Sequence, residues 1–418
     1  MTPHVGSEVE RLRQVILHRP GKEMTRLTPS NKDALLFDDV LWLAEAQREH
    51  DAFASLLRDE GVEVLLLDEL LADTMDDPKA RRYVMDRVFD ERVYGPGLTD
   101  SLWSMADSMS SPELADLLIA GLTKQELLDW GENPRSVLAD MLEPDGLIVS
   151  PLPNHLFTRD TSAWLYDGVT VNSMRMPARQ RETVHFEAIY QFHPRFAEGE
   201  FNRWSSGNGD GPASTEGGDL LVIGNRSVLV GLSERTTPQG VERLARRLFD
   251  GGAVDRVVAL HMPVARAMMH LDTVFTMLDR ETFTAYQNLG QLPSVTIRPG
   301  TSAGKLDITR NAPEDMYRVI GEAAGIGGAP QVLVTPQDSV AAEREQWDDG
   351  CNFLAIRPGV VVGYERNVAT NDFLRSNGID VLTVPGSELG RGRGGPRCMS
   401  CPTVRDNNSP ESLEGTQA

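Results

Sequence analysis

The sequence predicts an α/β fold built from a short ββαβ unit, two strands around a turn followed by a helix and a third strand, that occurs five times. Three observations support it: turn residues between short apolar runs, helices with apolar residues at helical spacing, and a helical pattern confined to residues 72–146. Small sheets of this kind can close radially and leave only short, protected edges. We therefore expect a five-bladed, pseudo-symmetric α/β propeller with an inserted helical bundle.

The third and fifth units give the clearest pattern. In the third, strands at 220–223 and 228–232 flank Gly224-Asn225, two residues that tolerate positive φ in a hairpin turn. Thr237 opens an expected helix at 237–250, and a buried strand follows at 254–262. The fifth unit has the same order, with expected elements at 352–356, 360–364, 369–376 and 379–384 around a turn at residues 357–359.

The other three units show a weaker pattern. The first has an expected strand at 12–17, a helix at 40–59 and a strand at 62–67. The second and fourth begin with hairpins around Asp167-Gly168 and Asp279-Arg280 and continue into helices at 178–190 and 313–324. Because sequence identity between the units is low, the repeat rests on pattern alone.

The helical insertion sets the expected domain division. Helices at 77–93, 111–120 and 124–130 with few strand-like runs predict a bundle at 72–146. Residues 1–71 and 147–418 then form the two parts of the propeller domain. Two further segments are expected to be irregular: a Gly- and Ser-rich loop at 204–218 that covers a pocket, and a polar tail at 405–418.

Composition bounds the class of protein. Of 418 residues, 40% are hydrophobic and 25% charged, which is ordinary for a soluble globular chain. A net charge of -21 argues against nucleic-acid binding, since the Arg-rich segment at 391–397 is the one short basic cluster. Neither a signal peptide nor an apolar run of roughly 20 residues is evident. We expect a cytoplasmic protein without membrane contact, and its three cysteines are expected to be reduced.

A candidate nucleophile, Cys398, follows a cationic, glycine-rich loop at residues 390–397. Nearby positive charge favours a thiolate, the reactive form of cysteine. Cys398 and Cys401 also form a C-x-x-C pair, but a zinc site needs a second ligand pair, and Pro402 indicates an irregular segment rather than a redox helix. The pattern alone leaves a nucleophile and a structural thiol equally open, whereas Cys351 is expected in the core.

Acidic residues and a histidine lie at the start of successive units. His270-Leu271-Asp272 is expected to be a strand, which places both polar side chains on one face. Asp160, Glu216 and Asn352 each lie just before or at the start of an apolar strand, so a ring of units would gather them with His270 and Asp272 into one site suited to a cation. Taken singly, each residue also fits a structural role. His270 fits a buried histidine that is hydrogen-bonded by its neighbour, and each acid fits a residue that stabilises a turn.

Together these motifs resemble the arginine deiminase family over essentially the whole chain. The matching segments are Phe157-Thr158-Arg159-Asp160, Thr215-Glu216-Gly217-Gly218-Asp219, Met269-His270-Leu271-Asp272, and the loop from Arg393 to Cys398 with Cys-Met-Ser-Cys-Pro. The resemblance implies the five-bladed α/β propeller of guanidine-modifying enzymes and hydrolysis of L-arginine to L-citrulline and ammonia. It also implies no cofactor, no metal and a homo-oligomer, either a dimer or a tetramer.

The resemblance further assigns roles to individual residues. Cys398 matches the nucleophile, His270 the general acid and base, and Glu216 the carboxylate that orients His270, while Asp160 and Asp272 match the acids that hold the guanidinium. The substrate-binding set implied in the same way is Asn154, Phe157, Arg179, Arg235 and Arg393. Asn154, Arg179 and Arg235 would receive the substrate carboxylate, although the two arginines also fit solvated surface positions. One departure is Pro396-Arg397, where the family commonly has Gly-His.

Two other functions remain open. A related hydrolase or amidinotransferase acting on a modified arginine would use similar residues, but the helical insertion distinguishes the arginine deiminase family from those relatives. A non-catalytic arginine-binding protein would need the acids alone, so Cys398 and His270 count against it. A redox or zinc protein based on Cys398 and Cys401 fits least well.

Overall fold

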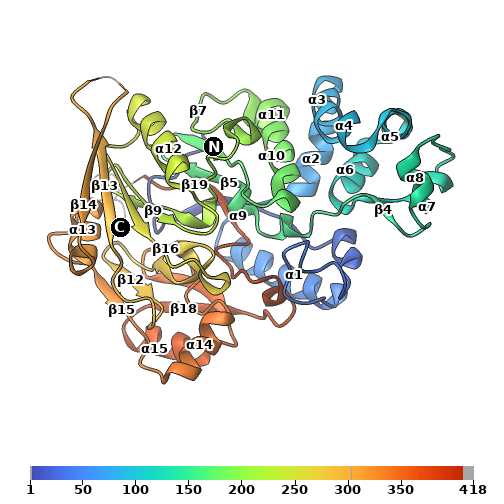
Figure 1. The fold of residues 1–418 in the computed structure, drawn as a ribbon. Helices are drawn as coiled ribbons and strands as arrows, with labels where there is room; N and C mark the ends of the chain where they lie inside the picture. The colour runs from blue at the N-terminus through green and yellow to red at the C-terminus, as the bar shows by residue number, and fades with distance from the viewer. Residues whose placement is uncertain (1, 303, 408–418) are drawn as a thin grey trace, which may run out of the picture.

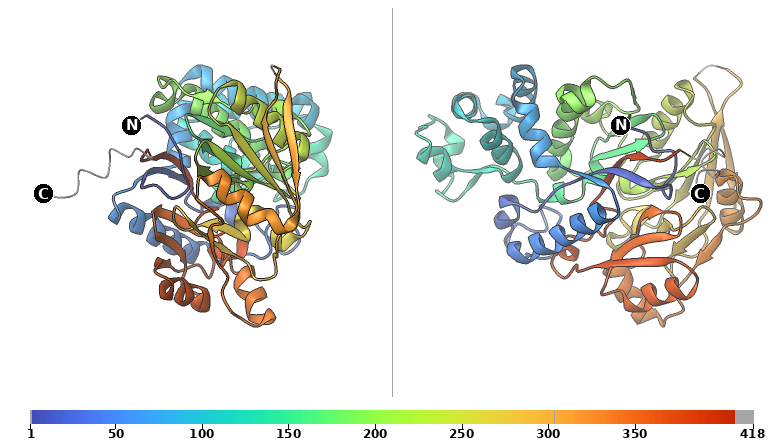
Figure 2. Two further views of the ribbon diagram at one scale, coloured as in Figure 1. Left: turned by 90° about the vertical axis from the view of Figure 1, so that its left-hand side faces the viewer. Right: turned by 180° about the vertical axis from the view of Figure 1, so that it is seen from behind.

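The computed structural model describes residues 2–302 and 304–407, and its fold is mixed α/β (Figure 1). Within these residues the strands form six sheets. One end of the molecule is helical, and the sheets fill the rest, as the reverse view in Figure 2 also shows. No helix in the described ranges is long and apolar enough to cross a bilayer.

Five of the sheets share one arrangement, in which a central strand pairs antiparallel with one neighbour and parallel with the other. In chain order of their central strands they contain β19 (Cys401–Arg405), β1 (Leu12–Leu17) and β2 (Glu63–Leu66); β5 (Ser162–Leu165), β6 (Gly168–Val171) and β7 (Asn202–Arg203); β8 (Leu220–Gly224), β9 (Ser227–Leu232) and β10 (Arg256–His261); β11 (Phe275–Met277), β12 (Thr282–Ala285) and β15 (Gln331–Leu333); β16 (Leu354–Arg357), β17 (Val360–Tyr364) and β18 (Asp380–Val384).

A helix connects each central strand to its parallel neighbour, as the predicted ββαβ order requires. These helices are α1 (Leu43–Asp59), α10 (Gln180–Phe192), α12 (Pro238–Asp250), α13 (Met316–Ala324) and α15 (Val368–Ser376). Three other α-helices lie in connecting segments: α9 (Thr158–Thr161) before β5, α11 (Pro194–Ala197) between α10 and β7, and α14 (Ser339–Trp347) between β15 and β16. The predicted repeat is therefore present in all five places.

The first unit takes one of its strands from the far end of the chain. β19 pairs antiparallel with β1, so the expectation of an irregular segment around Pro402 and a tail from Arg405 was wrong. The ladder is irregular where Val15 faces Pro402, which lets the strand tolerate the missing N–H of proline. Arg405 is buried and donates hydrogen bonds to the carbonyls of Glu10 and Ala355, while residues 408–418 of the expected tail lie outside the described residues.

The fourth unit carries a hairpin that the sequence pattern did not predict. β13 (Ser294–Pro299) and β14 (Leu306–Asn311) follow β12 in the chain but extend the neighbouring sheet, because β13 pairs with β10. The resulting strand order is β14-β13-β10-β9-β8. In Figures 1 and 2 this hairpin reaches beyond the body of the molecule.

The third unit shows how local sequence fixes an element. The predicted hairpin is present, but its turn is one residue later than expected, with positive φ at Asn225 (46°) and Arg226 (50°). Thr237 caps α12 by accepting a hydrogen bond from the Gly240 N–H at 3.1 Å, and the apolar face of α12 is buried. The cap and the apolar stripe together explain why this helix begins and packs where the sequence predicts.

The predicted helical insertion is present between β2 and the second unit. It contains α2 (Leu67–Met75), α3 (Pro78–Val88), α4 (Glu91–Tyr94), α5 (Pro96–Ser108), α6 (Ser111–Ala120), α7 (Lys124–Asp129) and α8 (Val137–Met141), with a small sheet of β3 (Leu122–Thr123) and β4 (Leu147–Val149).

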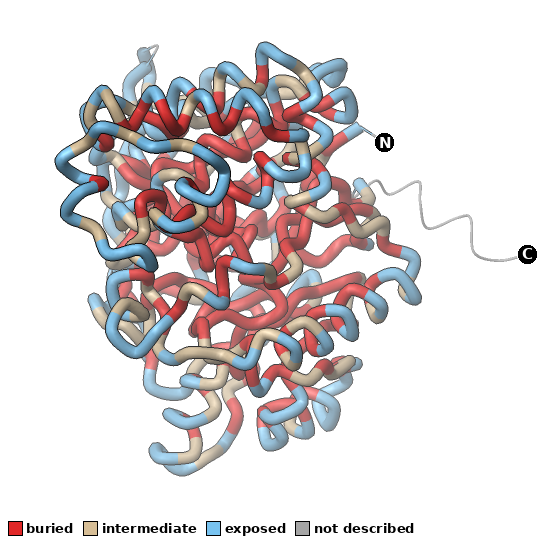
Figure 3. Tube along the Cα trace, turned by 90° about the vertical axis from the view of Figure 1, so that its right-hand side faces the viewer, coloured by how far each residue is buried: buried red, intermediate tan, exposed pale blue. Residues whose placement is uncertain are grey.

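The insertion shares its interior with the sheets. Leu98 and Leu118 of the insertion belong to the same buried cluster as Trp164 and Phe186 of the second unit. Figure 3 shows the buried residues concentrated in the interior, with the exposed ones at the periphery. The proposed domain limits at residues 71 and 146 stay a prediction, because α2 starts at Leu67 and the core is continuous across them.

Replacing the cap of α12 tests this account of the third unit. We expect Thr237→Ala to lower the free energy of unfolding by about 1 kcal/mol, because the first turn of α12 loses its side-chain acceptor. Urea unfolding followed by circular dichroism measures the change. Thr237→Ser keeps an acceptor and should remain close to the parent; equal losses in both variants would contradict the assignment of Thr237 as a cap.

Candidate active site

One side chain of the candidate site comes from the start of each unit. Asp160 in α9 (Thr158–Thr161) precedes β5, Glu216 precedes β8, His270 precedes β11, Asn352 precedes β16 and Cys398 precedes β19. All five residues are buried. Short polar contacts join His270 to Glu216 and Asp160, and Asn352 to Cys398, and the charge of Asp160 raises the pKa of Cys398. Equivalent positions of the repeat therefore deliver the polar groups of a single site.

His270 lies between two carboxylates. Its Nε2 is 2.8 Å from Glu216 Oε2, and its Nδ1 is 3.5 Å from Asp160 Oδ1. The expected strand at His270-Leu271-Asp272 was wrong: an extended His270 leads into a 3-10 turn at Leu271–Thr273. The turn still presents His270 and Asp272 to the site, because Leu271 is anchored in the hydrophobic core.

The carboxylates keep the His270 ring charged. Burial disfavours the imidazolium, but Asp160, Glu216 and Asp219 outweigh it and raise the pKa of His270 to about 9. Burial raises the pKa of Glu216 as well, but His270 and Arg235 outweigh this effect and lower it. Glu216 and His270 therefore form a carboxylate–imidazolium pair at neutral pH. Glu216 is held in place by the Arg175 N–H, which donates to its Oε1 at 3.0 Å.

Cys398 sits beside an amide and an acid. Asn352 Nδ2 is 3.1 Å from Cys398 Sγ, Asn352 Oδ1 accepts from the Cys398 N–H at 3.0 Å, and Asp272 Oδ2 is 3.6 Å from the sulfur. Burial, followed by Asp272, Asp160 and Asp349, raises the pKa of Cys398 well above its ordinary value. The group is therefore a neutral thiol in this state.

The arginines of the preceding loop do not make Cys398 a thiolate, contrary to the expectation from the basic loop: Arg397 lowers the pKa of Cys398, but burial and the acids outweigh it. Arg391 pairs with Asp39 and Glu388, and Arg397 pairs with Asp272 and Glu8. Their charge is used in these ion pairs, so the acids dominate the electrostatics around the sulfur.

Asp160 and Asp272 are each held by one buried arginine. Arg179 Nη1 donates to Asp160 Oδ2 and Arg397 Nη1 donates to Asp272 Oδ2, both at 2.6 Å. The other oxygen of each acid, Oδ1, is buried with no hydrogen-bond partner among the described residues. Two fixed acceptors next to His270 and Cys398 are suited to a planar cation with N–H donors.

The same donor atoms also satisfy the spacing of a cation site. Ligand atoms of Asp160, Glu216 and His270 lie within 4.8 Å of one another. A positively charged group is thus the electrostatically favoured occupant, whether organic or metallic, and the expectation of no metal stays a prediction. Gly218 leaves room for the occupant, since a Cβ there would be 2.7 Å from His270 Cγ and 2.9 Å from Asp160 Oδ1.

The residues predicted to receive a substrate carboxylate lie around this cluster. Arg179 is occupied by Asp160, Glu182 and the carbonyls of Asn154 and Phe157. Asn154 donates its amide to the carbonyl of Leu35 at 2.7 Å. Their role in carboxylate binding stays a prediction, and in this state Arg179 positions Asp160.

Arg235 is also buried and paired. Its Nε donates to Glu234 Oε1 at 3.2 Å, its Nη1 lies 3.6 Å from Glu216 Oε2, and its Nη2 lies 3.9 Å from the sulfur of Met269. Its role in carboxylate binding stays a prediction.

Phe157 and Arg393 belong to the cover of the site. A Cβ on Gly392 or Gly394 would come within 2.7 Å or 2.4 Å of the Phe157 ring, so the glycines let the loop lie flat on this ring. Arg393 has a left-handed backbone (φ 63°), and its guanidinium lies 3.6 Å from the centre of the Trp347 ring. Its three guanidinium nitrogens have no hydrogen-bond partner in the described part of the chain.

The sequence predicts Asn352 in the site from its position at the start of the fifth unit, and in the structure its side chain contacts Cys398. The structure adds two residues that sequence reasoning did not place there. Arg397 donates to Asp272 and holds it in place. The family resemblance did not reveal this role, because the family commonly has another residue at this position. Asp349 is buried with both oxygens unpartnered among the described residues, and burial raises its pKa to about 7.

Residues 33–405 match the family model described as arginine deiminase. The chain belongs to the arginine deiminase family. Its fold is that of guanidine-modifying enzymes, since solved structures of such proteins align over nearly its full length.

SxtG, an amidinotransferase from Microseira wollei, aligns with a TM-score of 0.58 at 12% identity over 98% of this chain and 99% of that chain. The N-terminal domain of ArgZ, a cyanobacterial arginine dihydrolase bound to substrate, gives 0.54 at 13% identity over 94% and 98%. DDAH from Pseudomonas aeruginosa, complexed with citrulline, gives 0.52 at 14% identity over 94% and 99%. At these identities the similarity establishes the fold, and membership of the arginine deiminase family rests on the family match.

Removing the Glu216 charge tests the electrostatics of the site. We expect Glu216→Gln to lower the pKa of His270 from about 9, because a carboxylate 2.8 Å from Nε2 stabilises the imidazolium and an amide does not. NMR titration of the ¹⁵N-labelled ring measures the shift. Glu242→Gln, on the exposed face of α12, makes the same chemical change away from the site and should leave the titration unaltered; an unmoved His270 titration in Glu216→Gln would refute the proposed coupling.

Proposed function

We propose that this member of the arginine deiminase family hydrolyses L-arginine to L-citrulline and ammonia through a covalent Cys398 intermediate. The observation that carries the proposal is that the buried Oδ1 atoms of Asp160 and Asp272, two acids beside His270 and Cys398, have no hydrogen-bond partner among the described residues. A guanidinium is planar, positively charged and a poor electrophile, so a catalyst must fix its plane and bring a strong nucleophile to its carbon. The site offers one acceptor oxygen on each of the two acids, a proton donor in His270 and a sulfur in Cys398.

The first half of the reaction forms the covalent intermediate. Asp160 and Asp272 accept the guanidinium N–H groups, and the thiol proton of Cys398 passes to solvent as the cation binds. The sulfur attacks the guanidinium carbon to form a C–S bond. The His270 imidazolium gives its proton to one nitrogen, the C–N bond breaks, ammonia leaves, and a positively charged thiouronium remains on Cys398.

The second half restores the enzyme. His270, now neutral, takes a proton from a water molecule that attacks the thiouronium carbon. The tetrahedral adduct breaks its C–S bond, the hydroxyl proton returns to the sulfur, and citrulline is released. His270 is again an imidazolium and Cys398 again a thiol, the forms favoured without a bound cation.

Because the pKa of Cys398 is raised, the proposed scheme requires a cation to bind before the thiolate is favoured. Burial and the acids Asp272, Asp160 and Asp349 oppose the thiolate when no cation is bound. A bound guanidinium would cancel part of this negative field and favour the thiolate. We therefore infer that the substrate activates the nucleophile that attacks it.

We also propose that the five ββαβ units are blades of a pseudo-symmetric propeller. Contacts between neighbouring units support the ring: β19 lies against β5, α9 against the turn before β8, and that turn against the one after His270. Thr276 then donates to the carbonyl of Cys351, and β16 lies against β1. Each unit thus contacts the next, and the fifth contacts the first.

The structural neighbours differ in activity, and these activities are the alternatives to the proposal. One neighbour is an amidinotransferase and another is a dimethylarginine dimethylaminohydrolase. Arginine hydrolysis is favoured because the family match, over residues 33–405, is to arginine deiminase. A cytoplasmic location, a dimer or tetramer, and the absence of a cofactor remain predictions from the sequence.

The activity itself is tested by citrulline release. We expect the purified protein to convert L-arginine to citrulline and ammonia in buffer containing EDTA, and Cys398→Ser to abolish turnover while keeping the parent circular dichroism spectrum. Cys351→Ala removes a buried thiol that does not contact the proposed substrate and should stay active. Full activity in Cys398→Ser, or loss of activity on chelation, would exclude the mechanism.

Absorbance of the thiolate near 240 nm tests whether a bound cation favours the thiolate form of Cys398. We expect little thiolate at pH 7 in the free protein, because the pKa of Cys398 is raised, and more when an unreactive guanidinium compound is bound. The Cys398→Ser protein supplies the baseline, so that only the signal of this sulfur is counted. An equal thiolate fraction with and without the cation would rule out substrate activation.

A further inference from the structure

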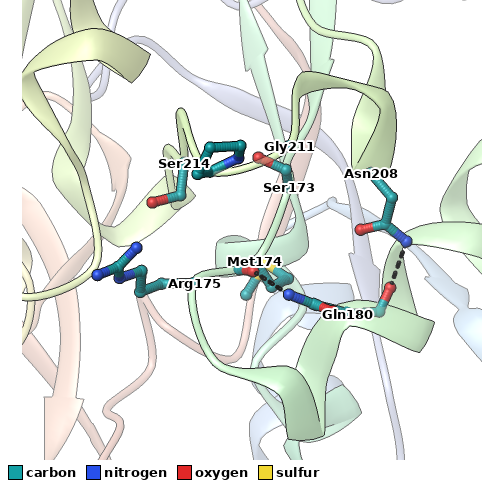
Figure 4. Close-up of a pocket in the computed structure, with 8 residues that line it drawn as sticks. Ser173, Met174, Arg175, Gln180, Asn208, Gly211 and Ser214 are labelled. Atoms are coloured by element: carbon teal, nitrogen blue, oxygen red, sulfur yellow. Dashed lines mark hydrogen bonds between the residues drawn. The ribbon is translucent and has the colours of Figure 1, made fainter.

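Several pockets lie outside the catalytic cluster, and the charge of their linings differs. The pocket in Figure 4, of about 370 Å³, is formed in part by the loop at 204–218, as the sequence predicts, and no acidic residue is among those that line it. A second pocket, termed the insertion pocket, has a volume of about 340 Å³ and is lined by five acids: Glu23, Asp68, Glu69, Asp73 and Asp116. The proposed function gives the insertion pocket no role.

The insertion pocket lies where the first unit meets the helical insertion. His18 and Glu23 come from the segment after β1, Asp68 from α2 and Asp116 from α6. Helix α2 packs beside α6, as Figure 1 shows, and α6 packs against the 3-10 turn at Lys22–Arg26. The acids of the pocket therefore come from three segments that meet around one cavity.

The buried His18 side chain leaves one ring nitrogen of this lining unused. The side chain is 2% exposed, and its Nε2 lies 3.2 Å from Glu23 Oε1. Its Nδ1 is buried and has no hydrogen-bond partner among the described residues, and the same holds for Asp68 Oδ1. When Nε2–H is donated to Glu23, neutral His18 presents Nδ1 as an acceptor. Two buried acceptors without a partner are costly, and they are suited to a ligand with N–H donors.

The electric field in the insertion pocket favours a positive charge. Burial opposes a charge on His18 and would lower its pKa. Three acids, Glu23, Asp68 and Glu182, outweigh burial and raise the pKa of His18. A cation bound in the pocket would experience the same field, and it would take the place of the proton on His18.

The other lining residues narrow the class of ligand. Among the described residues that line the pocket, Arg19 is the one arginine or lysine, and it donates to Asp51 at 2.7 Å, so an anion would find no free cation there. A single metal ion is also disfavoured. Within the described ranges, three ligand atoms within 4.8 Å of one another occur at Asp160, Glu216 and His270 and not in this pocket. An organic cation, whose N–H groups are spread over several atoms, fits acids that are spread over three segments.

We propose that the insertion pocket is a second ligand site, which binds a small organic cation through His18 Nδ1 and the carboxylates of Asp68 and Asp116. Two kinds of compound share this chemistry: alkylammonium compounds, such as diamines, and guanidinium compounds. The site lacks a nucleophile, so it binds the cation without altering it. The inference does not depend on the proposed function, because no residue of the catalytic cluster lines this pocket.

The test adds putrescine, a diammonium compound, or methylguanidinium to the full chain. NMR of the ¹⁵N-labelled histidine rings, with His18 assigned from the spectrum of His18→Gln, shows whether a probe binds beside His18. We expect at least one probe to move the His18 resonances, and the probe that does so at the lower concentration identifies the class of ligand. Asp68→Asn should weaken this binding about tenfold, the loss expected for one charge-assisted hydrogen bond. Calorimetry measures the same difference without an NMR assignment.

Asp100→Asn, at an exposed position of α5 in the same insertion, is the matched control and should bind both probes as the parent does. A probe held by the catalytic acids instead would move the His270 resonances and bind Asp68→Asn as tightly as the parent. That result, or His18 resonances that neither probe moves, overturns the proposal. Failure of the proposed function is distinguishable, because it would show as no citrulline release while the binding of these probes at His18 persisted.

Discussion

The rest of the site depends on two buried carboxylates that each keep one oxygen available to a cation. Asp160 and Asp272 each have one oxygen paired with an arginine and the other without a hydrogen-bond partner among the described residues. An unpartnered buried carboxylate is costly unless its surroundings fix it. Arg179 and Arg397 provide that fixation, and Glu182 and Glu8 in turn hold the two arginines. The site thus contains two series of ion pairs, Glu182–Arg179–Asp160 and Glu8–Arg397–Asp272. Each series ends in a carboxylate oxygen suited to a guanidinium.

This charge arrangement sets the protonation of the reacting groups. The acids that attract a cation also keep His270 charged and Cys398 neutral, so the site without a cation combines a ready proton donor with an inactive sulfur. In the proposed reaction, substrate binding and nucleophile activation are then the same electrostatic event. A site of this kind limits reaction of the thiol with other electrophiles, because the thiolate is unfavourable without the cation.

The sequence predicted the elements whose signals are local. Thr237 and the apolar stripe of α12 place that helix, and the start of each unit marks Asp160, Glu216 and His270. Interactions between distant segments were not predictable in this way: the pairing of β19 with β1 and the addition of β13 to the neighbouring sheet leave no short-range pattern. The partners of arginines also escaped prediction, since no spacing rule connects Arg397 to Asp272 across 125 residues. The family resemblance supplied the roles of Cys398 and Arg393 that pattern alone left open.

The pairing of β19 with β1 has a consequence for biosynthesis. Cys398 and the strand that anchors it are among the last described residues of the chain, yet their sheet begins with β1 near the first. While the ribosome is still adding residues, the first sheet lacks an edge strand and the site lacks its sulfur. A chain that stops before Cys398 would therefore lack both the proposed nucleophile and the edge strand of the first sheet, and we expect it to be inactive in the proposed reaction.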